Sequence, residues 1–104
     1  MHAQRSFDFT RAAGIQSRFD DFDRAHPEVF RLFRFFAHML KQKGKERFSA
    51  DAILHRIRWE FAVNMECDGG FKVNNDFSSR YARKLISEDP AFDGFFELRR
   101  LKAQ

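Results

Sequence analysis

The most regular hydrophobic pattern in the chain predicts a helix over residues 27–43. Apolar side chains cover most of its circumference, and Pro27 and Gly44 suit its first turn and its end. Its polar side chains form one narrow stripe of Arg31, Arg34, His38 and Lys41. We expect a central core helix, with the alternative that part of its apolar surface faces a second protein.

A second helix is predicted over residues 49–64. Ser49 is a natural N-cap, and Ile53, Ile57 and Phe61 form one apolar ridge at helical spacing. Trp59 lies on the flank of this ridge, so we expect it to be packed rather than available for stacking on a base.

A third helix is predicted from Asn75 or Asp76 to the residue before Pro90. Its inner face is apolar, with Phe77, Tyr81, Ala82, Leu85 and Ile86. Its outer face is polar and basic, with Ser79, Arg80, Arg83, Lys84 and Ser87.

The segments around the third helix predict short extended pieces. Asp68, Gly69 and Gly70 favour a tight turn in a hairpin or structured loop. The sequence after Pro90 fits either a strand that pairs with residues 71–73 or a helical turn that docks Phe92, Phe95 and Phe96 inward. We favour the extended form. The fold class expected is mainly α: a three-helix core with one or two short strands, resembling a winged helix.

Length and composition indicate one domain. The chain has 104 residues and 43% hydrophobic residues, enough for one compact core. We expect residues 1–19 to be a flexible N-terminal tail and residues 20–104 to form a single helical domain. With 15 Phe residues the core must consist largely of flat rings, and any Phe beyond the needs of that core would indicate a surface for a partner.

Charge makes nucleic acid one candidate partner. Lys and Arg number 19 against 15 Asp and Glu, a mild excess of +4 that permits binding of DNA or RNA without requiring it. The third helix offers Arg80, Arg83 and Lys84 to phosphates, and Asn74, Asn75 and Ser79 to base edges or backbone. A secondary basic patch comprises Lys41, Lys43, Lys45 and Arg47.

Two observations weigh against this hypothesis. The connection between Asn64 and Asn75 is far longer than the turn of a plain helix-turn-helix. Basic residues on an exposed helix face also serve solubility alone.

No set of residues indicates an enzyme, a cofactor or a metal site. His26, His38 and His55 lie on different elements without metal-ligand spacing. The acidic cluster Asp20, Asp21 and Asp23 has no second carboxylate group near it in sequence, so a solvated surface is the simpler interpretation. We therefore expect a protein that is not an enzyme.

The single cysteine, Cys67, fits a reducing compartment, and no segment approaches the roughly 20 apolar residues of a membrane span. We expect a cytoplasmic protein with no membrane partner. The apolar girth of the 27–43 helix makes a homodimer a side hypothesis.

Four segments carry a resemblance to a group of small bacteriophage and prophage proteins: HPEVFRLF, RFSADAILHRIRWE, FKVNNDFSSRYARKLI and DPAFDGFFELRRLK. The resemblance covers about residues 20–102 and implies a phage origin and a host-cell location, but no catalytic role. Two hypotheses follow. The first is a nucleic-acid-binding or regulatory protein that uses the basic third helix. The alternative is a protein-interaction factor that binds and modulates a host complex, of the anti-defence or inhibitor type.

Overall fold

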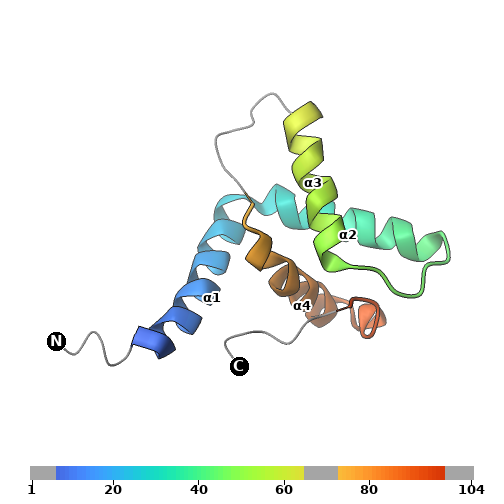
Figure 1. Ribbon diagram of the computed structural model, residues 1–104. Coiled ribbons are helices and arrows are strands. Elements are labelled where there is room, and N and C mark those ends of the chain that lie inside the picture. Colours follow the sequence, from blue (N-terminus) through green and yellow to red (C-terminus); the bar gives the residue numbers. More distant parts are fainter. Residues whose placement is uncertain (1–6, 65–72, 98–104) are drawn as a thin grey trace.

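The computed structural model of the protein (Figure 1) describes residues 7–64 and 73–97, without the side chains of residues 7–13, 64 and 75. Within these ranges the elements are α1 (Phe7–Ala25), α2 (Pro27–Gln42), α3 (Ala50–Asn64), the short 3-10 helix η1 (Asn75–Phe77), α4 (Ser78–Glu88) and a second 3-10 helix, η2 (Pro90–Phe92). The predicted mainly α class is confirmed. The three predicted helices correspond to α2, α3, and η1 together with α4.

The N-terminal part differs from the predicted tail. Residues 7–19 belong to α1, which crosses the expected boundary between residues 19 and 20. Phe19 is buried, and Ile15 and Phe22 are half-buried. These three apolar residues stand at helical spacing, which gives the helix one side to bury despite its many polar residues.

Proline sets the corner between α1 and α2. A residue that precedes proline is disfavoured in the helical conformation, and His26 has φ −132° and ψ 67°. The His26 amide donates to the Phe22 carbonyl at 2.8 Å and so completes α1, while Pro27 occupies the first turn of α2. The chain therefore changes direction at one residue, and α1 and α2 diverge from this corner (Figure 1).

The connection from α2 to α3 follows the predicted capping residues. Gly44 has φ +94°, and the Lys45 amide donates to the Leu40 carbonyl at 3.1 Å, which is a Schellman ending of α2. At the start of α3, the Ser49 hydroxyl accepts from the Ala52 amide at 3.2 Å. Both ends of this connection are thus fixed by local hydrogen bonds.

The expected short strands are not confirmed, and residues 98–101 of the C-terminal candidate lie outside the described residues. The described residues contain no sheet, and the extended piece forms only an isolated parallel bridge between Phe48 and Phe96. The predicted partner was residues 71–73, of which 71 and 72 lie outside the described residues. Phe92, Phe95 and Phe96 are all buried. Their burial agrees with the alternative prediction, in which these three residues dock into the core.

The hydrophobic core joins all four α-helices to this C-terminal segment. Tyr81 on α4 lies at its centre: the ring centroids of Phe19 and Phe33 are 4.8 and 5.7 Å from that of Tyr81. Phe33 in turn lies 5.6 Å from Phe96. Phe33 and Ile57 are fully buried as predicted, whereas Phe36 is half-buried at the edge of the core.

We predict that Phe33→Ala lowers the free energy of unfolding by about 3–5 kcal/mol, because it removes a buried ring and leaves a cavity. Phe35→Ala is the matched control, since Phe35 has the same side chain on the same helix but is 56% exposed. Its effect should stay within about 0.5 kcal/mol. Urea denaturation of both variants measures the difference, and equal midpoints would show that the two faces of α2 are wrongly assigned.

Candidate functional site

The basic outer face of α4 is partly covered by α1. The Arg80 guanidinium donates from Nε to Gln16 Oε1 at 3.0 Å. The Lys84 ammonium forms an ion pair with the Asp23 carboxylate and lies 4.3 Å from the centre of the Phe30 ring. Arg83 is exposed and has no ion-pair partner in the part of the chain that the structure describes. Two of the three predicted phosphate contacts therefore hold α1 and α2 against α4.

The polar residues before α4 also serve the fold. Asn74 Oδ1 accepts from the Asp76 amide at 2.9 Å, so this side chain caps the turn into η1. Ser79 is half-buried. The hydroxyl of Ser78 donates to an Asp51 carboxylate oxygen, which ties the start of α4 to the start of α3. The side chain of Asn75 lies outside the described residues.

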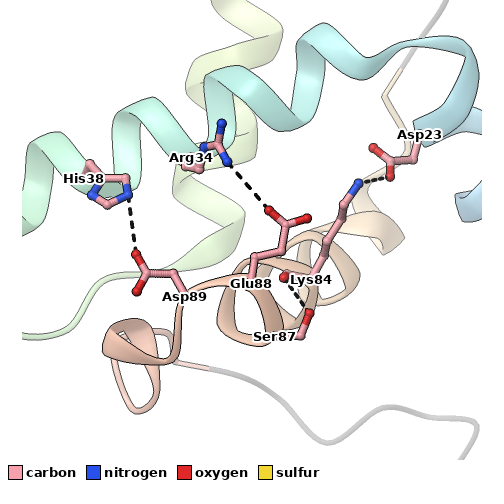
Figure 2. Close-up of polar contacts among 7 residues, drawn as sticks. All are labelled: Asp23, Arg34, His38, Lys84, Ser87, Glu88 and Asp89. Carbon is pink, nitrogen blue, oxygen red and sulfur yellow. Dashed lines mark hydrogen bonds and ion pairs between the residues drawn. The ribbon is translucent and has the colours of Figure 1, made fainter.

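Three residues of the polar stripe of α2 contact the C-terminal end of α4 or the residues that follow it, and Figure 2 shows two of them, Arg34 and His38. Arg34 approaches Glu88 at 3.6 Å and His38 approaches Asp89 at 3.7 Å. Lys41 Nζ donates to the Ala91 carbonyl at 2.8 Å. A helix C-terminus carries partial negative charge, so basic groups are favourable beside it. The stripe is therefore largely committed to contacts within the molecule.

The rest of the secondary basic patch is open to solvent. Lys43, Lys45 and Arg47 follow one another around the turn at Gly44, and all three are exposed. None of them has an ion pair or hydrogen bond with another described side chain. Lys41 differs from them, because its ammonium also lies 5.1 Å from the centre of the Phe92 ring.

A second surface combines α2 and α3, and its exposed side chains are large and apolar. Phe35 and Met39 on α2 are 56% and 39% exposed, and Trp59 and Val63 on α3 are 53% and 57% exposed. We call this surface the α2/α3 aromatic face and define it as Phe35, Phe36, Met39, Arg56, Trp59 and Val63. The exposure of Trp59 corrects the expectation that it would be packed. Helical periodicity within α3 does not tell which sides of α3 are covered by other helices.

Ring and guanidinium contacts link Phe35 on α2 to Trp59 on α3. The rings of Phe35 and Phe36 lie 5.5 Å apart. The Arg56 guanidinium lies 5.5 Å from the Phe36 ring and 5.0 Å from the Trp59 ring. Glu60 accepts from this guanidinium at 2.7 Å and holds it between the two rings. The apolar residues of α2 and α3 are thus joined through Phe36 and Arg56.

The residues that the sequence offered as candidates for a metal or catalytic site do not form one among the described residues. The described residues contain no group of three or more His, Cys, Asp or Glu side chains placed to hold a metal ion. His26 lies 3.6 Å from Glu28, and Asp21 lies 3.1 Å from Arg24. Cys67, Gly69 and Gly70 lie outside the described residues.

No described helix is both long enough and apolar enough to cross a membrane. No protein-family model matches the chain, and searches among curated proteins and solved structures give no significant match. Function is therefore inferred from the surfaces of this chain itself.

We predict that Lys84→Ala lowers the free energy of unfolding by about 1–3 kcal/mol, because it leaves the Asp23 carboxylate without its cation. This carboxylate is largely buried, and its Oδ1 atom has no hydrogen-bond partner among the described residues. Arg83→Ala is the matched control and should change stability by less than about 0.5 kcal/mol. Urea unfolding decides between them, and equal stability of the two variants would contradict the structural role of Lys84.

A further prediction concerns Tyr81, which is fully buried and whose hydroxyl has no hydrogen-bond partner among the described residues. Burial raises the pKa of Tyr81 far above its usual value, and the negative charges of Asp23 and Glu28 raise it further. The folded state keeps the proton that the unfolded state loses near pH 10, so stability is complete below about pH 10 and falls above it.

Tyr81 is the only tyrosine of the chain, so tyrosinate absorbance reports on this residue alone. We expect no tyrosinate signal near pH 10 in the folded protein, and ordinary titration near pH 10 in denaturant. The same titration of Tyr81→Phe provides the baseline. Ordinary titration in the folded protein would mean that α1 does not bury the ring.

Proposed function

We propose that the protein is a small protein-binding module and that a partner protein docks on the α2/α3 aromatic face. The exposure of Phe35 and Trp59 on neighbouring helices carries this proposal. Continuous apolar surface that stays exposed costs solubility and commonly marks an interaction site. Trp and Arg, which are enriched among the residues that dominate binding energy, stand in contact here as Trp59 and Arg56.

This proposal corresponds to the second hypothesis from the sequence, a protein-interaction factor of the anti-defence or inhibitor type that binds and modulates a host complex. The resemblance to phage-encoded proteins favours a bacterial host complex as the partner, and the cytoplasm of the host cell as the place of action. A module of this kind acts by occupying a surface, so it needs no catalytic group.

The test is affinity capture from a bacterial lysate with three baits: the wild-type protein, Trp59→Ala and Arg83→Ala. Trp59 and Arg83 are both exposed, so both variants should fold, which circular dichroism verifies. A partner should be retained by the wild type and by Arg83→Ala and lost with Trp59→Ala. With the purified partner, Trp59→Ala should weaken binding by a factor of about 30, the effect of a typical hot-spot residue. Equal retention by Trp59→Ala would overturn the proposal.

Nucleic-acid binding is the second candidate, and the exposed Lys43, Lys45 and Arg47 favour it. These residues would meet phosphates more readily than Arg80 and Lys84, which contact α1. A winged-helix arrangement would in addition need a hairpin over residues 65–74, most of which lie outside the described residues. Mobility shifts over a salt series test this candidate. Replacing Lys43, Lys45 and Arg47 by Ala should flatten the salt dependence by about 0.9 per lost phosphate contact on duplex DNA.

A further inference from the structure

Two exposed basic residues flank the α2 part of the α2/α3 aromatic face. Arg31 precedes Phe35 by four residues, and Lys43 follows Met39 by four residues, so each lies about one helical turn beyond the apolar pair. Both are exposed and unpaired among the described side chains. Arg56 supplies a third cation inside the face.

Two acidic residues on the same helices, Glu28 on α2 and Glu60 on α3, have partners among the described residues. The Glu60 carboxylate is bound to Arg56 at 2.7 Å and is only 20% exposed. Glu28, in the first turn of α2, lies 3.6 Å from His26. The face therefore offers apolar side chains together with positive charge that is not fully neutralised.

The apolar side chains form two rows with helical spacing. Phe35 and Met39 are four residues apart on α2, and Trp59 and Val63 are four residues apart on α3. Rows of this spacing accept the side-chain ridges of another helix, whose own apolar residues recur every three or four positions.

We propose that the docking partner presents an acidic amphipathic helix to this face. Its apolar side chains pack against Phe35, Met39, Trp59 and Val63, and its flanking carboxylates pair with Arg31 and Lys43. This inference rests on the proposed function and adds the chemistry of the partner to it.

A second copy of the chain fits this face less well. A symmetric pair would bring the same basic groups of both copies together, and each chain carries a net charge of +4. Single-stranded nucleic acid also fits less well, because the aliphatic Met39 and Val63 offer no flat surface on which a base can stack. The Trp59 ring is in addition shared with the Arg56 guanidinium at 5.0 Å.

The experiment selects binders from a yeast-displayed library of helices of about 18 residues, or five turns, with randomised surface positions. Three targets are used: the wild-type protein, Trp59→Ala and the double variant Arg31→Glu with Lys43→Glu. Wild-type protein should enrich helices with an apolar stripe flanked by Asp and Glu. Trp59→Ala should enrich none of them. The charge-reversed variant should enrich helices with flanking Lys and Arg, and should bind the acidic winners at least about ten times more weakly.

The outcomes separate this inference from the function on which it rests. In one contrary result, the selected helices carry an apolar stripe without flanking Asp or Glu; in another, the charge-reversed variant selects the same helices as the wild type. Either result would overturn the acidic character of the partner but would leave the docking face supported. Winners that bind Trp59→Ala as well as the wild type would overturn both. Trp59-dependent dimerisation in sedimentation, or displacement of the helices by a single-stranded oligonucleotide, would assign the face to another occupant and overturn the acidic helix.

Discussion

The structure depends on the burial of one aromatic ring, that of Tyr81. Its neighbours come from two other helices: Phe19 from α1, and Phe30 and Phe33 from α2. Phe33 continues the chain of ring contacts to Phe96, so the C-terminal segment is fixed by the same cluster. Rings have definite edges and faces and pack best in a few geometries, which makes this cluster specific as well as hydrophobic. The positions of α1, α2 and α4 follow from it.

This packing decides which surfaces are left for a partner. Because α1 is placed by Phe19, its polar residues Gln16 and Asp23 come to lie against Arg80 and Lys84. Basic residues of α4 that could bind an anion therefore stabilise the helix packing instead. The opposite holds on the other side of α2, where Phe35 and, on α3, Trp59 remain more than half exposed. The protein thus exposes aromatic side chains on α2 and α3 and uses Arg80 and Lys84 of α4 in helix packing.

Local signals made part of this fold predictable from the sequence. Pro27, Gly44 and Ser49 act within one helical turn, so the ends of α2 and the start of α3 could be assigned correctly. The burial of Phe33 and Ile57 followed from helical periodicity. In α1, by contrast, polar residues dilute the apolar spacing of Ile15, Phe19 and Phe22, and the segment resembles a tail.

Pairs that are distant in sequence could not be predicted in the same way. Lys84 meets Asp23 from 61 residues away, and no local pattern marks one as the partner of the other. From the sequence alone, Lys84 is therefore assigned to the exposed basic face of the third helix. The exposure of Trp59 depends likewise on how α3 packs against helices that are distant in sequence. The site predicted from the sequence was therefore the outer face of one helix, α4. The surface that we propose as the docking site is formed by two helices, α2 and α3.

The most direct test maps amide chemical shifts of the 15N-labelled protein during two titrations at one ionic strength, with an acidic amphipathic helical peptide and with a short DNA duplex. Our account predicts that the peptide shifts amides around Phe35, Met39, Trp59 and Val63, and that the duplex leaves the amides of α4 unchanged. Shifts of Arg80, Arg83 and Lys84 with the duplex, together with no response around Trp59 to the peptide, would contradict it.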